Sequence, residues 1–138
     1  MIHHVKKIWG SEDWLINNEK YCAKFLNLNQ GYECSVHYHM KKDETFYVLA
    51  GEVELYLFNL REICCANLPI PRHDWFINNK IQILQNMKSI ILKAGDQYRL
   101  SPFTAHKFRA VTFCAKILEV STTHYEDDSY RLTESQKL

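Results

Sequence analysis

Hydrophobic and polar residues alternate through most of the chain from Lys20 onward, in short runs that end at glycine, asparagine or proline. A period of two places successive side chains on opposite faces of a β-strand. The pattern predicts strands over residues 21–28, 33–40, 45–50, 52–58, 89–93, 97–100, 106–111 and 113–121. No amphipathic helix of any length is indicated. Many short strands bounded by turns predict an all-β sandwich or barrel.

Two segments depart from this pattern. Residues 1–20 contain Trp9 and Trp14 around a turn at Gly10-Ser11, which indicates an opening segment anchored by two tryptophans. Residues 59–88 are irregular and proline-containing, and we expect a long loop or an extra hairpin there. No linker rich in proline, serine or glycine interrupts the chain, so residues 1–138 are predicted to form a single domain.

Composition narrows the class of protein. The chain has 138 residues, 46% of them hydrophobic, which is enough for a sizeable core. Its 17 basic and 16 acidic residues give a net charge of +1, without the basic excess that nucleic-acid binding needs. No apolar run reaches the roughly 18 residues of a membrane span, and the first residues lack the apolar stretch of a signal peptide. Five cysteines without a CxxC pair predict free, buried or half-buried thiols and a cytoplasmic location.

The strand predicted over residues 33–40 contains the chemistry of greatest interest. Its alternation places Ser35, His37 and His39 on one face and Cys34, Val36 and Tyr38 on the other. Two histidines at positions i and i+2 lie about 7 Å apart at their Cα atoms and can converge on one ion. Glu44 starts the next strand, and His106 lies on a later one beyond a proline-containing corner. Two histidines and a carboxylate suit Fe, Mn, Ni or Zn, although a lone His-x-His is equally explained by two ordinary imidazoles.

A family pattern favours the metal. Gly31, His37, His39, Glu44 and Gly51 occupy every defined position of the first cupin motif, G-x5-H-x-H-x4-E-x6-G. The second motif is looser: Gly95 and His106 are in register, but Ser101 and Phe103 stand where proline and glycine are usual. The chain thus resembles the cupin superfamily. The resemblance implies a double-stranded β-helix, the cupin jelly roll, with one divalent transition metal (Mn, Zn, Fe or Ni) bound by His37, His39, Glu44 and His106.

The flanking segments resemble sugar-pathway cupins. Lys7-Ile-Trp9-Gly10 and the stretch from Ile117 to Arg131 are similar to the cupin domain of type II phosphomannose isomerases. Lys42 and the spacing from His39 to Glu44 look closer to D-lyxose isomerase-like proteins. The tail also resembles that of small single-domain cupins of polysaccharide biosynthesis. These resemblances imply a metal-dependent isomerase or epimerase acting on a sugar or sugar phosphate, and cupins commonly pair as homodimers.

An isomerase of this kind needs a base that moves a proton between two carbons. Our candidates are Glu119, which shares strand parity with Ile117, and Lys42, in the loop after the histidines. Glu119 could instead be a surface carboxylate opposite Lys116 or Lys24, and a solvated lysine is at least as good an interpretation of Lys42.

Substrate binding has three candidates. Arg131 and Lys24 could meet an anion, with Asp128 orienting the arginine through a bidentate pair. A structural salt bridge that holds the tail is the better interpretation of Arg131. His124 could line the barrel or cap a turn.

Two other functions stay open. The first is a non-catalytic, metal-binding cupin that binds sugars or partners a carbohydrate-biosynthesis enzyme. The weaker one is an Fe(II) dioxygenase, because three histidines and a glutamate also hold iron for oxygen chemistry.

Overall fold

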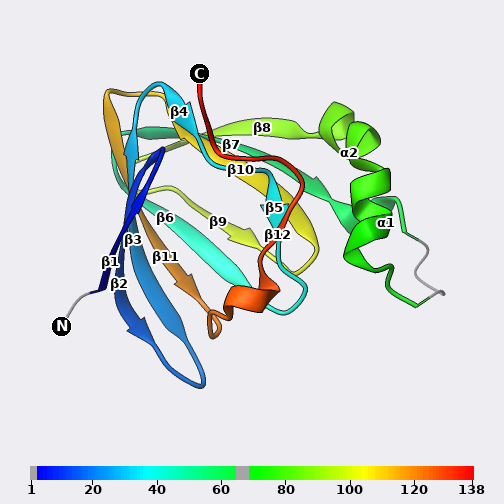
Figure 1. The fold of residues 1–138 in the computed structure, drawn as a ribbon. Helices are drawn as coiled ribbons and strands as arrows, with labels where there is room; N and C mark the ends of the chain where they lie inside the picture. Colours follow the sequence, from blue (N-terminus) through cyan, green and yellow to red (C-terminus); the bar gives the residue numbers. More distant parts are fainter. Residues whose placement is uncertain (1–2, 65–68) are drawn as a thin grey trace.

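Two antiparallel sheets face each other across the molecule in the computed structural model, which describes residues 3–64 and 69–138 (Figure 1). The six-stranded sheet has the order β1-β2-β3-β11-β6-β9, with bounds β1 His3–Lys7, β2 Gly10–Asn17, β3 Cys22–Asn29, β11 Cys114–Ser121, β6 Glu44–Ala50 and β9 Gln97–Leu100. The five-stranded sheet has the order β12-β5-β10-β7-β8, with bounds β12 Tyr130–Arg131, β5 His37–Tyr38, β10 Thr104–Ala110, β7 Glu52–Asn59 and β8 Lys88–Lys93. A short pair, β4 Tyr32–Glu33 and β13 Gln136–Lys137, forms a separate two-stranded sheet beside β10. The predicted all-β architecture is confirmed.

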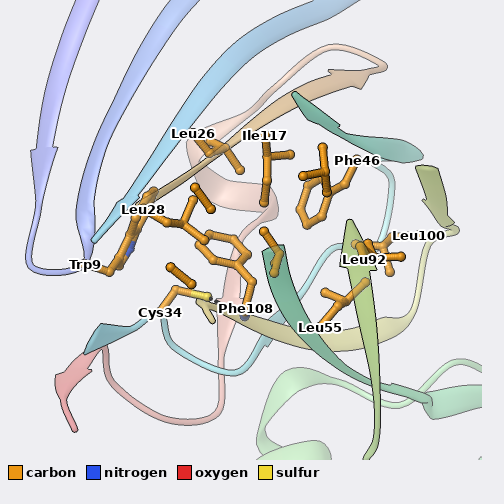
Figure 2. Packing of buried hydrophobic residues seen from close by; sticks show 14 residues of the cluster. Trp9, Leu26, Leu28, Cys34, Phe46, Leu55, Leu92, Leu100, Phe108 and Ile117 are labelled. Atoms are coloured by element: carbon orange, nitrogen blue, oxygen red, sulfur yellow. Dashed lines mark hydrogen bonds between the residues drawn. The ribbon is translucent and has the colours of Figure 1, made fainter. Parts of the chain in front are cut away.

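The main core fills the space between the two sheets. Inward-facing apolar side chains come from both sheets, and Figure 2 shows them interdigitating around Phe108 of β10. The cluster includes Leu26, Leu28, Phe46 and Ile117 from the six-stranded sheet and Leu55, Leu92 and Phe108 from the five-stranded one. Alternation explains this packing, because every second residue of β3 and β11 is buried.

The predicted strand 33–40 is interrupted. Residues 34–36 have no strand pairing, and they separate β4 from β5. In the gap the backbone is held by side chains of the tail: the Ser35 and Val36 N–H groups donate to hydroxyls of Ser135 and Thr133. The break also makes one predicted face wrong, because Cys34 packs in the main core and not with Val36.

The opening segment, described from residue 3 onward, forms more than an anchor. β1 and β2 make an antiparallel hairpin that extends the six-stranded sheet. Trp9, in the turn between them, packs edge-on against Phe108 in the core, with ring centroids 5.0 Å apart. The hairpin thus forms one edge of the sheet (Figure 1).

The prediction of a loop or hairpin for residues 59–88 was wrong. After the 3-10 turn η1 Leu60–Glu62, this part of the chain contains two short helices, α1 His73–Asn78 and α2 Lys80–Asn86. Figure 1 shows them beside the five-stranded sheet, on the side away from the six-stranded sheet. Phe76 and Ile83 of these helices complete a second buried cluster with Val36, Tyr38, Phe58, Leu60, Phe103, Ala105 and Leu132.

The corner before β10 has an unusual backbone. Phe103 adopts φ 65°, a left-handed conformation that favours glycine and that only this non-glycine residue among those described adopts. It is the residue that replaces the usual glycine of the second cupin motif. The Phe103 N–H donates to the carbonyl of His39, and its side chain is buried in the second cluster. Burial of the ring therefore offsets the cost of the backbone.

Cysteines and helices complete the description. Cys22, Cys34, Cys64 and Cys114 are free thiols; the first two are buried, Cys64 is half-buried and Cys114 is exposed, contrary to the expectation for that residue. Cys65 lies outside the described residues. Within residues 3–64 and 69–138, none of the helices has the length and apolarity that a membrane span requires.

Candidate functional site

Three neighbouring strands of the six-stranded sheet change character along their length. At one end their inward side chains are apolar, whereas towards the other end they are Lys24 on β3, Glu44 on β6 and Glu119 on β11. The strand register places Glu119 opposite Lys24. All three side chains are buried. Because isolated buried charges are costly, such a group persists only when its members are paired, and this end of the barrel interior is a polar site.

His37, His39 and His106 meet at this site. His37 on β5 and His106 on β10 are direct cross-strand partners, and their ring centroids lie 4.3 Å apart. His39 follows β5 directly. One ring nitrogen of each histidine lies within 4.8 Å of the others, close enough for the three to hold one metal ion. The structure therefore brings together the three histidines that were predicted as ligands.

Hydrogen bonds orient each of these rings. In all three, Nδ1 faces a backbone carbonyl, which can only accept, so the nitrogen must be the donor. The acceptors are the carbonyls of Ser35 for His37 (2.8 Å), Asp128 for His39 (2.8 Å) and Thr104 for His106 (2.9 Å). A neutral imidazole that donates from Nδ1 has its lone pair on Nε2. The three Nε2 atoms are thus prepared as metal ligands.

The surroundings keep two of the rings neutral. Loss of solvation, helped by the neighbouring His106 and His39 rings, lowers the pKa of His37 well below its usual value. Burial lowers the pKa of His39 to about 4, although Glu44 acts in the opposite direction. Both imidazoles are therefore unprotonated at neutral pH, the state in which they bind metal.

Glu44 adjoins the triad and supplies the strongest indication of a cation. Its Oε1 lies 3.1 Å from His106 Nε2 and 3.7 Å from His39 Nε2. Both Glu44 Oε1 and His106 Nε2 are buried without a hydrogen-bond partner. Since His106 donates from Nδ1, the contact between its Nε2 and Glu44 Oε1 is favourable only with a positive charge there, either a second proton on the imidazole or a metal ion. The residues present therefore fit a metal ion.

Lys42 and Glu119 form a buried ion pair beside Glu44. Lys42 Nζ lies 2.6 Å from Glu119 Oε2 and 3.4 Å from Glu44 Oε2. Burial alone would lower the pKa of Lys42, but the two carboxylates outweigh it and raise that pKa. Burial raises the pKa of Glu119, and the Lys42 charge opposes this only in part. Glu119 is therefore neither on the surface nor paired with Lys116, and Lys42 is not solvated.

Lys24 and His124 continue the polar wall. Lys24 Nζ and Lys42 Nζ each lie 3.3 Å from His124 Nδ1. Burial, followed by the two ammonium charges, lowers the pKa of His124 to about 4. Lys24 also lies 3.7 Å from Glu12 Oε1 and 3.8 Å from the centroid of the Trp14 ring. His124 thus lines the barrel interior, one of the two places proposed for it.

Arg131 and Asp128 do not form the expected pair. The Asp128 carboxylate accepts the backbone N–H groups of Met40, Lys41 and Lys42 instead, at 2.9–3.3 Å. Arg131 is exposed at the mouth of the site, where its backbone pairs with His37. The prediction that Asp128 orients Arg131 is therefore wrong: Asp128 is buried and its acceptors are already used.

A cavity open to solvent connects these residues. Its volume is about 120 Å³, smaller than the about 300–1,000 Å³ of sites for drug-sized molecules. His37, His39, Lys42, Glu119, His124, Lys24 and Arg131 line it, together with Trp9, Glu12 and Trp14 of the opening segment. Sequence reasoning missed the roles of Glu12 and Trp14. Their two-residue spacing was a usable signal, because it places them on the same face once residues 10–17 are recognised as a strand.

Residues 10–137 match the family described as D-lyxose isomerase. The chain belongs to the D-lyxose isomerase family. Among curated relatives, the D-lyxose ketol-isomerase of Thermofilum sp. is 31% identical over 119 residues, 81% of this chain and 62% of the relative. The D-lyxose/D-mannose isomerase of Thermosediminibacter oceani is 32% identical over 120 residues, 83% of this chain and 62% of the relative. The chain therefore spans less than two thirds of the length of either isomerase.

Solved structures place this member of the D-lyxose isomerase family in the cupin jelly roll. The oxalate decarboxylase of Lactobacillus farciminis superimposes with a TM-score of 0.67 at 14% identity, over 95% of this chain and 34% of the other. The capsular polysaccharide assembling protein CapF of Staphylococcus aureus gives 0.69 at 11% identity, over 96% and 32%. KdgF of Halomonas sp. gives 0.60 at 14% identity, over 85% and 81%. These likenesses establish the fold alone, and they confirm the predicted cupin jelly roll.

Proposed function

We propose that this protein is a metal-dependent sugar isomerase that interconverts an aldose and a ketose. The observation that carries the proposal is the position of the buried Lys42–Glu119 pair directly beside Glu44 and the histidine triad, at a cavity that opens to solvent. Membership of the D-lyxose isomerase family supports the same reaction class.

The Nε2 atoms of His37, His39 and His106, with Glu44, would hold one divalent transition metal such as Mn, Zn, Fe or Ni. Bound there, the ion would act as a Lewis acid towards two adjacent oxygens of a sugar. The Nδ1 hydrogen bonds of the three rings fix their orientation before the ion arrives. Because four protein ligands would fill a tetrahedral zinc site, the binding of two sugar oxygens as well would favour an ion that accepts six ligands, such as Mn, Fe or Ni.

Glu119 is the proposed base. A carboxylate whose pKa is raised by burial is a better proton acceptor near neutral pH than a solvated one. Glu119 would take the proton from one sugar carbon and return it to the adjacent carbon, while the hydroxyl proton would pass from one of the two sugar oxygens to the other, so that no proton is consumed. Lys42 donates a hydrogen bond to Glu119 Oε2 and orients it towards the cavity. Its ammonium also balances part of the charge of Glu44 and Glu119.

Membership of the D-lyxose isomerase family favours an uncharged sugar over a sugar phosphate. Within the cavity, Lys42 is matched by Glu119 and Lys24 by Glu12, and His124 contacts Glu126 at the mouth. Lys7 and Arg131 also line the cavity and form no ion pair among the described residues, so the preference rests on the family and not on the charge of the cavity. Arg131 lies at the exposed rim, and we propose it as a residue that contacts the sugar or closes the mouth. Lys24 and His124 are proposed to contact the sugar hydroxyl groups.

Hydrogen exchange at the sugar tests this function. Purified protein with Mn²⁺ is incubated in D₂O with D-lyxose, D-mannose and their phosphates, and deuterium at C2 is followed by NMR. We expect exchange with a free aldose and none with the phosphates. Metal binding without exchange on any sugar would contradict the isomerase and favour a binding module, whereas oxygen consumption with Fe(II) would favour the dioxygenase.

Glu119→Gln examines the base directly. The amide cannot accept the proton, so we expect exchange to fall by about 10²–10⁴-fold, while metal content per chain stays that of the wild type. Glu19→Gln, an exposed glutamate outside the cavity, is the matched control and should exchange normally. Wild-type turnover in Glu119→Gln would remove Glu119 from the mechanism. A cytoplasmic location, a single domain and a homodimer remain predictions.

A further inference from the structure

Asp128 lies beside the candidate site, and the proposed isomerase reaction gives it no role. It ends the short 3-10 turn η2 Glu126–Asp128, drawn in orange beside the loop after β5 in Figure 1. Its side chain is only 3% exposed. No lysine, arginine or histidine in the described residues forms an ion pair with it, so its charge must be satisfied in another way.

Three consecutive backbone N–H groups satisfy it. Asp128 Oδ1 accepts from Met40 at 2.9 Å and from Lys41 at 3.1 Å, and Oδ2 accepts from Lys42 at 3.0 Å. Hydrogen bonds to an ionised acceptor are shorter and stronger than neutral ones. Three of them from successive residues fix the course of the loop that joins His39 to Lys42.

The same residue also holds a candidate metal ligand. The carbonyl oxygen of Asp128 accepts the Nδ1–H of His39 at 2.8 Å, which directs the opposite ring nitrogen, Nε2, towards Glu44. Asp128 therefore contacts both ends of the loop: His39 through its main chain and Lys42 through its side chain. Glu44 forms ion-pair contacts with the side chains of both residues, whereas Asp128 is the one described residue that hydrogen-bonds to both.

We propose that Asp128 is a positioning residue that fixes His39 for the metal and Lys42 for Glu119. The proposal rests on the function inferred above, because it assigns Asp128 a role through groups of that site. Without the carboxylate, residues 40–42 would lose their common acceptor, and Lys42 Nζ would no longer be confined between Glu119 and Glu44. Metal affinity and proton transfer would then weaken together.

The experiment compares Asp128→Asn with Asp127→Asn. Both replace one acidic residue of the same turn by its amide, but Asp127 is exposed and accepts none of these bonds. Three quantities are measured in each: the hydrogen-exchange rates of the Met40, Lys41 and Lys42 amides, the dissociation constant for Co²⁺, and kcat and KM in the exchange assay. Amides of β3 and β11 report whether the barrel is folded.

In Asp128→Asn we expect the three loop amides to exchange at least about tenfold faster than in Asp127→Asn. The Co²⁺ dissociation constant should rise by about 10–100-fold, as for other residues that orient metal ligands, and kcat should fall more than KM changes. Asp128→Glu, which keeps the charge, should recover part of the affinity. Loop amides and Co²⁺ affinity equal to those of Asp127→Asn would overturn the proposal.

Two measurements test the role of Asp128 even if Asp128→Asn does not fold or the protein is not an isomerase. In the folded wild type the three amides must be protected more strongly than those of exposed loops, and rapid exchange there would sink the idea without any variant. Amide protection and Co²⁺ affinity need no sugar, so their outcome is separate from the outcome of the D₂O assay.

Discussion

At the scale of single residues, the candidate metal site is marked by two buried polar atoms that have no hydrogen-bond partner. The Nδ1 atoms of all three histidines donate to backbone carbonyls, while Glu44 Oε1 and His106 Nε2 face each other without a hydrogen-bond partner. A fully satisfied polar core would have no such pair. The unmatched acceptors are therefore the most specific sign of a cation that the molecule offers.

The contacts of Glu33, a buried residue away from the candidate site, predict that the folding stability depends on pH. Glu33 bonds to Lys107 at 2.9 Å and to Gln136 at 2.7 Å. Burial alone would raise the pKa of Glu33, but these two partners outweigh it, and that pKa lies below its usual value. A carboxyl with a depressed folded-state pKa contributes stability above its unfolded value, near 4.5, and loses that contribution as pH falls through the folded value.

We predict that Glu33→Gln removes this part of the pH dependence. At pH 7 the variant should be less stable by about 1.5 kcal/mol, the order of a hydrogen bond to a charged group. The difference should shrink as the pH falls below 4.5. Urea unfolding of both proteins from pH 7 to pH 3 measures it, and a difference that stays constant with pH would count against a role for the Glu33 charge.

At the scale of elements, the two helices act as a cover for the five-stranded sheet. Without α1 and α2, Phe58, Leu60 and Phe103 would face solvent on the side of the sheet away from the main core. Each helix contributes one fully buried side chain, Phe76 or Ile83. Because helices of six and seven residues are marginal alone, packing on the sheet must hold them.

We expect Phe76→Ala to destabilise the protein by about 3–5 kcal/mol, the cost of removing a buried aromatic side chain. Metal affinity should be nearly unchanged, since Phe76 does not line the cavity of the candidate site. Ile81→Ala is the matched control: that side chain is 71% exposed, and its loss should change the stability by about 0.5 kcal/mol or less. Denaturant unfolding with and without Co²⁺ measures both. Equal losses in the two variants would mean that the helices do not depend on the second cluster.

At the scale of the whole molecule, metal binding at the proposed site would be coupled to folding, since the candidate ligands come from three separate strands and the segment after β5. A ligand that binds only the folded state stabilises it by about 2.7 kcal/mol when its concentration is 100 times its dissociation constant. The strands that supply His37, His106 and Glu44 would thereby be tied together by one ion.

We therefore predict that Co²⁺ at that concentration raises the free energy of unfolding by about 2.7 kcal/mol, and that a chelator reverses the gain. His106→Gln should lose the gain entirely. His4→Gln, a change at an exposed histidine of the β1–β2 hairpin, should keep it. Thermal unfolding across a metal titration measures the effect, and an unfolding temperature that does not respond to metal in the wild type would contradict the site.

The sequence predicted some secondary-structure elements more accurately than others. The strands β6, β7 and β9 match the predicted ranges closely, because their alternation is regular and a glycine separates β6 from β7. The helices were not predicted, since six or seven residues are too few to show a helical period and neither helix has a side-chain cap. The interruption between β4 and β5 was hidden because tail hydroxyls from the far end of the chain replace the ladder there.

The candidate site shows the same division. Motif spacing located His37, His39, Glu44 and His106, and the strand register brings them together. The partner of Asp128 was mistaken, because a buried carboxylate can be satisfied by backbone N–H groups that no sequence pattern displays. The residue types were enough to predict which side chains could bind a metal. Which backbone groups donate or accept hydrogen bonds at the site could be seen only in the folded structure.

The corner at Phe103 has a consequence for the history of the family. Its left-handed backbone is tolerated because the ring is buried against the helical excursion. A homologue without that excursion would expose a large aromatic side chain and still bear the backbone cost, so selection should restore glycine there. We therefore expect homologues that have a bulky residue at this corner to have helices between β7 and β8 as well, and homologues without these helices to have glycine there.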